Sequence, residues 1–404
     1  MRITIAGGGA AGFFAAIRAA ELLPGTSVQI LERGKEVLSK VRVSGGGRCN
    51  VTHACFSPRD LVKHYPRGER ELLGPFHQFS CADTVEWFES RGVPTKIEAD
   101  GRIFPVSNKS QSIIDCLMGA AHNAGVEILL QQRISDFLPP EAPGDPWKIT
   151  SNDKVQATDR LLIATGSSTA VWDILNKLGM AIVPPVPSLF TFNIKDERIE
   201  GLPGLSVPAA EVHIEGSKLK STGPLLITHW GMSGPAILKL SAWGARELHQ
   251  HGYHFHLRVN WTGIPLQNLM EALEQHKKAF PRQLVSGQAI FQLPARLWRN
   301  LILACGITEH RRWADLAKKE MQQLLETLGN CRFTVQGKST FKEEFVTAGG
   351  VDLKEINFKT FESKRFPGLF FAGEVLDIDA ITGGFNFQAA WTGGWIAGGA
   401  MVAP

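Results

Sequence analysis

The chain contains 404 residues, of which 44% are hydrophobic and 20% are charged. This balance is ordinary for a globular protein and excludes a disordered chain or a fibrous repeat, while the length allows two or three domains with cores of their own. The formal net charge is +4, and the basic residues form no polybasic run. The charge therefore permits an anionic ligand or RNA but does not by itself favour nucleic acid.

The six cysteines are scattered along the chain and form no C-x-x-C pair. Their spacing argues against a disulfide scaffold, a zinc ribbon or a redox-active dithiol, so we expect reduced thiols and a cytoplasmic location. No cleavage-like boundary follows the apolar N-terminus, and we expect no signal peptide.

Residues 2–33 have the pattern of a nucleotide-binding strand, turn and helix. An apolar strand at residues 2–6 leads into the turn G-G-G-A-A-G, which is followed by a helix over residues 13–23 and a second strand over residues 27–31. The strand before the turn, the helix after it and the acid Glu32 at the end of the second strand make this signal stronger than a lone glycine motif.

Each part of this turn has a mechanical reason. Gly7 permits the tight turn, Gly9 lets the backbone approach a pyrophosphate, and Gly12 lets the helix lie close to the strand. The helix N-terminus offers N–H groups and positive dipole to phosphates. Glu32 lies where an acid accepts hydrogen bonds from ribose hydroxyls.

A second glycine-rich stretch, S-G-G-G-R-C-N-V-T, occupies residues 44–52. Three consecutive glycines do not form a regular element, and they expose backbone to a planar or anionic group. The alternative is a flexible linker. Because the stretch is short and framed by Arg42, Arg48 and Asn50, we favour a binding segment.

These two segments, with residues 228–235, 346–351 and 373–388, resemble the HI0933-like family of flavoproteins, which are related to FAD proteins of the glutathione-reductase type. The resemblance covers nearly the whole chain. It implies an α/β fold: a Rossmann-like FAD-binding domain with an inserted β-rich domain and a helical subdomain.

The resemblance and the turn chemistry together predict the residues that bind FAD. They are Gly7, Gly9, Ala10, Ala11, Gly12, Glu32, Arg33, Lys40, Arg42, Ser44, Gly45, Gly46, Arg48, Asn50, Val51, Thr52, Ile134, Ala164, Thr165, Gly166, Gly373, Glu374, Gly384, Phe385, Asn386 and Phe387.

Further strands of the predicted FAD-binding domain follow. We read strands at residues 126–130, 147–150, 154–157 and 160–163, with Ile134 near the end of the first. The family usually continues the motif A-T-G at residues 164–166 with another glycine and a proline-containing loop. This chain instead has S-S-T-A-V-W leading into a helix, which puts in doubt any substrate contact inferred from that loop.

The composition shifts near residues 184–187, and strands dominate from residue 189 to residue 228. Helical spacing follows at 266–278, 295–305 and 312–328. We therefore predict an FAD-binding domain over 1–188 and 341–404, a β-rich insertion over 189–260 and 330–340, and a helical subdomain over 261–329.

Four histidines cluster at positions 249, 251, 254 and 256. His254 and His256 alternate along a probable strand and would share a face, as metal ligands do. No cysteine or carboxylate pattern completes such a site, so we interpret the cluster as a solvated edge and predict no metal.

The last 25 residues carry no charge, which on length alone is compatible with a membrane span. Their glycines, Asn386 and Gln388 favour a buried, ligand-facing helix instead. The resemblance implies that Gly373 and Glu374 close on the ribityl and pyrophosphate part of FAD. It also implies that the N-terminus of the last helix points at the flavin ring, where its dipole stabilises the reduced form.

Candidates for catalysis beside the flavin are Arg48, Cys49 and Asn50. Arg48 could fix an anionic substrate or the flavin carbonyls, and Asn50 could hydrogen-bond the ring. Cys49 could be a thiol near the ring or a small buried filler. Arg102 and His229 are weaker candidates, more typical of residues that hold a loop.

Two functions remain open. The first is an FAD-dependent oxidoreductase, oxidase or reductase, that transfers a hydride to or from a small organic substrate. Only one complete G-x-G-x-x-G unit is present, so NAD(P)H would dock transiently at the flavin. The alternative is a flavoprotein that reduces or modifies an RNA base, with the helical insertion as the docking surface. A non-enzymatic FAD-binding module is a distant third.

Overall fold

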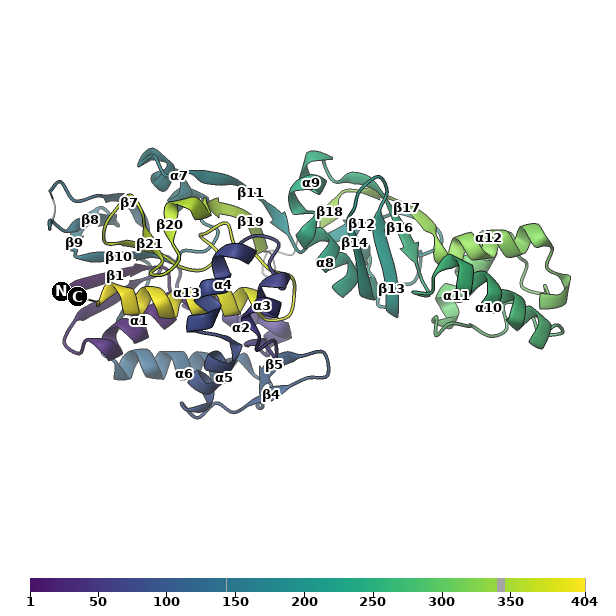
Figure 1. Ribbon diagram of the computed structural model, residues 1–404, viewed down its shortest axis with the longest axis horizontal. Helices are drawn as coiled ribbons and strands as arrows, with labels where there is room; N and C mark the ends of the chain where they lie inside the picture. The colour runs from purple at the N-terminus through teal and green to yellow at the C-terminus, as the bar shows by residue number, and fades with distance from the viewer. Residues whose placement is uncertain (143, 340–345, 404) are drawn as a thin grey trace. The chain divides into compact units, whose positions relative to one another are not determined.

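The computed structural model describes residues 1–142, 144–339 and 346–403. The chain divides into two compact units, residues 1–186 with 342–404 and residues 187–341 (Figure 1). These are called the first and second unit below. The expected boundary between a β-rich and a helical insertion stays a prediction.

The first unit is built on a seven-stranded sheet with the strand order β20-β21-β22-β10-β1-β2-β6. The five strands from β22 to β6 run parallel, with Ile5 paired to both Leu162 and Ile30. Parallel strands place their carboxyl ends at one edge, where such sheets bind ligands. The strands are β1 (Arg2–Ala6), β2 (Ser27–Leu31), β6 (Glu127–Leu129), β10 (Arg160–Ile163), β20 (Ile356–Asn357), β21 (Glu362–Ser363) and β22 (Leu369–Phe371).

Two helices of the first unit, α1 (Ala10–Leu22) and α13 (Phe385–Met401), lie side by side (Figure 1). A Cβ at Gly394 would lie 2.4 Å from the Ala11 carbonyl oxygen, and one at Gly398 would lie 2.5 Å from that of Ala15. The uncharged last helix is therefore glycine-rich because it packs closely on α1. Among the described residues, no helix is long and apolar enough to cross a membrane.

Smaller elements surround this core. The sheet β3-β5-β4, the sheet β7-β8-β9 and the pair β11-β19 complete the strands of the first unit. The strands are β3 (Thr52–His53), β4 (Thr95–Ile97), β5 (Arg102–Pro105), β7 (Ile134–Leu138), β8 (Trp147–Ser151), β9 (Lys154–Thr158), β11 (Ile182–Ser188) and β19 (Val346–Val351). The helices are α2 (Ser39–Gly47), α3 (Pro58–Leu61), η1 (Val62–His64), α4 (Glu69–Gln78), α5 (Cys81–Glu89), α6 (Ser110–Asn123), α7 (Thr169–Lys177) and η3 (Leu353–Glu355).

The second unit contains an antiparallel sheet of order β17-β16-β13-β14-β15-β12-β18. Its helices α10 to α12 gather at one end of the sheet (Figure 1) and share one hydrophobic core with it. The strands are β12 (Thr191–Asn193), β13 (Ser206–Ile214), β14 (Lys220–Ile227), β15 (Gly231–Ser233), β16 (His254–Asn260), β17 (Cys331–Gln336) and β18 (Lys338–Ser339). The helices are α8 (Pro235–Trp243), α9 (Ala245–Gln250), α10 (Leu266–Ala279), α11 (Ala295–Ala304), η2 (Trp313–Asp315) and α12 (Lys318–Gly329).

Two local expectations were wrong. The strand at residues 126–130 is an edge strand, β6, which is half-exposed rather than buried. The helix at residues 312–328 begins only at Lys318, after a 3-10 turn. The three glycines form no regular element, as expected: α2 is drawn to Gly47, but Ser44, Gly45 and Gly46 depart from helical geometry and Gly47 has a φ of +82°.

Candidate functional site

The turn between β1 and α1 leaves no room for side chains at two of its glycines. Gly7 has a φ of +111°, and a Cβ there would lie 2.4 Å from the Ala164 carbonyl oxygen. A Cβ at Gly12 would lie 2.1 Å from the Gly7 carbonyl oxygen. These glycines let β1, β10 and α1 meet closely, which is the steric role expected of them.

Gly9 differs, because a Cβ placed on it meets no protein atom within 4 Å. Gly9 is the N-cap of α1, and no side chain caps this helix end or places an acid in its first turn. The leading amides of α1, including those of Ala10 and Ala11, therefore face a space beside Gly9 with the helix dipole behind them. This cradle fits a pyrophosphate.

Glu32 organises the turn from the end of β2. Its carboxylate accepts hydrogen bonds from the amides of Gly8 (2.9 Å) and Gly34 (2.7 Å). Each oxygen keeps a further lone pair for a ribose hydroxyl. The Glu32 carbonyl accepts from the amide of Gln132, which brings the segment before Ile134 beside it, whereas Arg33 is exposed.

The break in α2 exposes backbone next to this turn. The Cys49 amide bonds the Ser44 carbonyl at 3.0 Å, and Gly46 has no protein atom within 4 Å of a built Cβ. Arg42 is held by Gln111 at 2.9 Å. The open backbone at Gly46 is suited to a planar group, as the three glycines predict.

Asn50 ties this segment to the start of α13. With its amide oriented to satisfy both neighbours, Asn50 donates to the Thr52 carbonyl (3.0 Å) and accepts from the Gly384 amide (2.9 Å). The Thr52 hydroxyl donates to Gln388 at 2.6 Å. Gly384 has a φ of +92°, and a Cβ there would lie 2.6 Å from the Thr52 carbonyl oxygen. The Asn50 side chain thus positions two segments.

The remaining predicted residues of α13 have structural side-chain contacts. Asn386 exchanges two hydrogen bonds with Ala380, and Phe387 stacks on Trp391. Phe385 stacks on the rings of His53 and His64, with ring centroids 4.6 and 4.2 Å apart. A flavin contact from these residues would therefore come through their backbone.

Glu374 closes the site from the segment after β22. One carboxylate oxygen accepts from the Thr347 amide at 3.0 Å, and the other pairs with the ammonium group of Lys40. The nearby hydroxyls of Thr165 and Thr347 are buried and have no partner among the described residues. Buried hydroxyls are normally hydrogen-bonded, so these orphaned groups are suited to a polar ligand.

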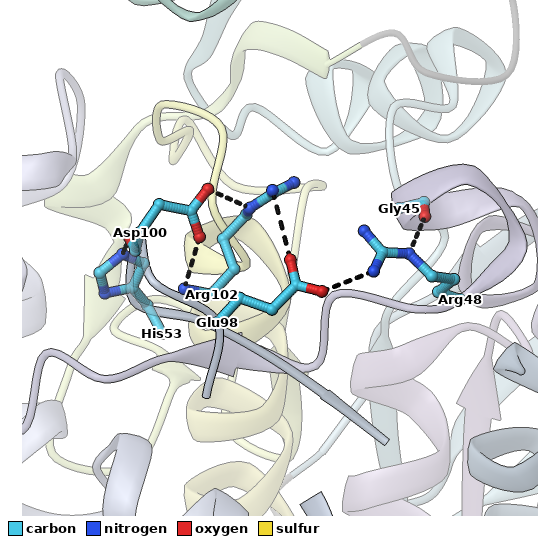
Figure 2. Close-up of polar contacts among 6 residues, drawn as sticks. All are labelled: Gly45, Arg48, His53, Glu98, Asp100 and Arg102. Atoms are coloured by element: carbon cyan, nitrogen blue, oxygen red, sulfur yellow. Dashed lines mark hydrogen bonds and ion pairs between the residues drawn. The ribbon is translucent and has the colours of Figure 1, made fainter. Parts of the chain in front are cut away.

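A charged chain runs along the sheet β3-β5-β4 (Figure 2). Arg48 pairs with Glu98 at 2.6 Å, and Glu98 also contacts Arg102, which pairs with Asp100 at 2.7 Å. The Asp100 carbonyl lies 3.2 Å from the His53 ring nitrogen Nε2. Arg102 thus holds its loop.

The guanidinium of Arg48 stacks on Phe104, 3.9 Å from the ring centre, while 34% of its side chain stays exposed. A cation held over an aromatic face and by a carboxylate has few orientations. Arg48 is therefore a fixed positive group that follows directly on the glycine segment.

Cys49 does not suit a reactive role. The residue is completely buried, and this burial raises the pKa of its thiol to about 12. The nucleophile is the thiolate, and this thiol stays protonated near neutral pH. Its burial and protonated state favour the buried filler over a thiol that reacts beside the flavin.

Three residues beside the candidate site were not predicted from the sequence. Thr347, Glu98 and His53 contact predicted site residues. Thr347 lies in the family segment 346–351, to which the sequence assigned no role, and Glu98 and His53 lie in none of the motifs. His53 has a buried Nδ1 without a described partner, and burial lowers its pKa.

In the second unit His229, a weaker candidate from the sequence, is exposed on a turn. The described residues contain no group of three side chains that could hold a metal.

The profile of the HI0933-like protein Rossmann domain matches residues 1–400. The chain belongs to the HI0933-like family. The cradle at Gly9, the carboxylates at Glu32 and Glu374 and the orphaned hydroxyls fit the FAD that this family binds. As an HI0933-like protein, the chain is an FAD-dependent oxidoreductase.

Relatives of this HI0933-like protein carry two different names. It is 30% identical to the ribosomal RNA dihydrouridine synthase of Haemophilus influenzae, over 96% of this chain and 95% of that protein. It is 28% identical to the 3-dehydro-bile acid delta(4,6)-reductase of Clostridium scindens, over 99% of each. The Escherichia coli ribosomal RNA dihydrouridine synthase is also 28% identical, over 99% of this chain and 97% of that protein.

Solved structures confirm the fold of the HI0933-like chain. The 3-ketosteroid-delta4-(5alpha)-dehydrogenase of Rhodococcus jostii matches with a TM-score of 0.52 and 14% identity, over 100% of this chain and 96% of that one. The 3-ketosteroid delta1-dehydrogenase of Sterolibacterium denitrificans gives 0.51 and 12%, over 99% of both. At these identities the likeness shows the architecture alone.

Proposed function

We propose that this protein reduces a carbon–carbon double bond conjugated to a carbonyl group. Dihydrouridine is uridine with the double bond beside its C4 carbonyl saturated. A delta(4,6) bond system in a 3-dehydro bile acid is conjugated to the 3-oxo group. The two activities named for the relatives therefore share one chemistry, which FAD supplies when bound by passing a hydride to the carbon remote from the carbonyl.

The observation that carries this proposal is the position of Arg48. As the hydride adds, negative charge develops on the substrate carbonyl oxygen, and a fixed guanidinium stabilises it. Arg48 is held by Phe104 and Glu98, so little reorganisation is needed at the moment of reaction. The carbon next to the carbonyl then takes a proton from water or a substrate-facing acid.

The site residues themselves are part of the proposal. The pyrophosphate would lie at Gly9, the adenosine ribose at Glu32, and the ribityl chain between Glu374 and the hydroxyls of Thr165 and Thr347. Asn50 and Gly384 would hold the backbone beneath the ring. The electrons would come from NADH or NADPH. The sequence contains a single complete dinucleotide turn, which FAD would occupy, so the nicotinamide cofactor would dock only transiently.

The test combines reduction and turnover. The purified yellow protein is mixed anaerobically with NADH or NADPH in a stopped-flow instrument, and the reduced protein is then mixed with cyclic enones or with oxygen. We expect a conjugated carbonyl to reoxidise the flavin faster than oxygen does. Arg48→Ala should slow this step by about 100-fold, with reduction unchanged. Oxygen as the only oxidant would support an oxidase and overturn the proposal.

A second candidate is the same reaction on an RNA base, and the charge distribution favours it. Residues 187–341 contain 18 lysines and arginines but 12 acidic residues, a formal charge of +6. The remaining residues contain 25 basic and 27 acidic ones, a formal charge of −2. A basic unit attached to a weakly acidic unit that would bind FAD suits a polyanionic substrate. An RNA substrate would also agree with the cytoplasmic location expected from the cysteines.

Ribosomal RNA transcribed in vitro, which lacks modified bases, distinguishes the two candidates. Incubation with the protein and NADPH should yield dihydrouridine, detected by mass spectrometry of the digested RNA. An enzyme that reduces free enones but leaves this RNA unchanged would restrict the function to small molecules.

A further inference from the structure

An exposed tryptophan stands at the tip of the turn between β14 and β15. Trp230 leaves 56% of its surface open to solvent. It lies within residues 228–235, a family motif whose function the flavin site does not explain. Tryptophan is enriched at interfaces, because it combines a large apolar ring with a polar N–H group.

The turn that carries Trp230 is rigid. Thr228 and Gly231 exchange backbone hydrogen bonds of 2.8 and 3.3 Å. The Thr228 hydroxyl oxygen also accepts from the amides of Trp230 (3.3 Å) and Gly231 (3.2 Å). The backbone of Trp230 is therefore held in one conformation, and an aromatic ring presented in this way loses little entropy on binding.

The turn is also anchored to the neighbouring strand. The Ile194 amide donates to the Trp230 carbonyl at 2.9 Å. Gly231 has a φ of +146°, and a Cβ there would lie 2.3 Å from the Phe192 carbonyl oxygen. Both contacts tie the turn to β12 and to the residue that follows it, so the position of Trp230 is set by the sheet.

The surroundings of Trp230 are polar. His229 precedes it and is exposed, and Lys195, which follows Ile194, is exposed as well. Two acidic residues come next in the chain: Asp196, which pairs with Arg198, and Glu197, which is exposed. The unit as a whole carries a charge of +6. A protein-binding hot spot is normally surrounded by further apolar side chains, whereas an aromatic ring near a lysine on a basic unit is typical of surfaces that bind single-stranded nucleic acid.

We propose that Trp230 is a stacking platform for an unpaired base of single-stranded RNA, with Lys195 beside the phosphates. This inference rests on the RNA candidate above and names the surface that would hold that substrate. Any base can stack on the indole, so the platform supplies affinity and leaves the choice of base to other contacts.

The experiment measures binding of the FAD-loaded protein to fluorescently labelled uridine-rich RNA, single-stranded or duplex, by anisotropy at several salt concentrations. The variants are Trp230→Ala, Trp230→Phe, Lys195→Ala and, as a matched control, Trp243→Ala. Trp243 is 41% exposed and is the last residue of α8. Flavin content and melting temperature show that each variant is folded.

Trp230→Ala should raise the Kd for single strands by about 5- to 100-fold, with an unchanged salt dependence because no charge is lost. Trp230→Phe should keep most of the affinity and Trp243→Ala all of it. Lys195→Ala should reduce the slope of log K against log salt by about 0.7.

Equal binding by the wild type and Trp230→Ala would overturn the platform while leaving the RNA candidate intact. An equal loss for duplex and single strand would also overturn it, because a paired base is not free to stack on the ring. If the wild type binds no RNA, the RNA candidate fails and the platform fails with it, whereas the enone reaction stays testable by itself.

Discussion

The ammonium group of Lys40 pairs with the carboxylate of Glu374, a residue 334 positions later in the chain. This contact joins α2 to the segment after β22, so this ion pair, like the Asn50–Gly384 hydrogen bond, links the two predicted halves of one cofactor site. The Lys40 side chain is 52% exposed and that of Glu374 is 18% exposed. An ion pair with one partner so exposed contributes only about 0–1 kcal/mol to folding, so replacing Glu374 should change the stability of the fold little.

We therefore expect Glu374→Ala to weaken FAD binding by about tenfold or more, because hydrogen bonds to charged groups contribute about 1.5–3 kcal/mol. Lys40→Ala should have a smaller effect, and the double variant should reveal coupling between them. Titration of the apoprotein with FAD, followed by flavin fluorescence, measures all three. A Kd for Glu374→Ala equal to that of the wild type would remove this residue from the site.

Two glycines of the first turn should respond differently to substitution. Gly9 has extended backbone angles and an open space around its built Cβ. Gly9→Val should fold and melt like the wild type but lose its flavin, because the side chain occupies the place of the pyrophosphate. Gly12→Ala should instead destabilise the fold by about 1–3 kcal/mol through overpacking. Circular dichroism melts and flavin absorbance separate these effects, and a flavin-loaded Gly9→Val would contradict the cradle.

Cys49 should resist alkylation in the folded protein. Burial raises the pKa of its thiol to about 12, so almost no thiolate exists at mildly alkaline pH. Partly exposed Cys55 is the internal control and should react first. Mass spectrometry after iodoacetamide treatment reports both, and Cys49→Ser should keep near-normal turnover. Rapid modification of Cys49 with loss of activity would return it to the list of catalytic candidates.

His53 should make the first unit less stable in acid. Burial is the largest cause that lowers the pKa of His53. The unfolded chain therefore binds this proton more readily than the folded one as the pH falls below about 6.5, and stability declines through that range towards the folded pKa. His53→Phe retains a ring to stack on Phe385 but cannot titrate. Melting curves from neutral to acid pH should decline less for this variant, and parallel curves would refute the assignment.

Arg67 and Asp379 form a buried, two-pronged ion pair, with the Asp379 side chain wholly inaccessible. Asp379→Ala should cost about 3–5 kcal/mol, because it removes the carboxylate that compensates a buried guanidinium. The double variant Arg67→Met with Asp379→Leu should recover much of that loss. Urea unfolding monitored by far-ultraviolet circular dichroism tests both. A single variant as stable as the wild type would mean that water reaches the guanidinium.

The sequence alone determined the elements whose cause is local. Gly7 and Gly12 are required by contacts within a short turn, and the alternation and length of the neighbouring segments predict β1, α1 and β2. The uncharged last helix was correctly predicted to be buried. Its glycines argued against a membrane span, and in the fold they pack closely against α1. The cofactor followed from these local motifs in their order.

Only the tertiary structure decided how distant segments use their side chains. The pairing of Lys40 with Glu374, the link from Asn50 to Gly384 and the burial of Cys49 depend on packing between residues far apart in the chain, which no local pattern encodes. The same is true of Trp230, whose neighbours in sequence do not reveal whether it is buried or exposed. Steric rules act over a few residues, whereas burial and charge pairing are properties of the assembled fold.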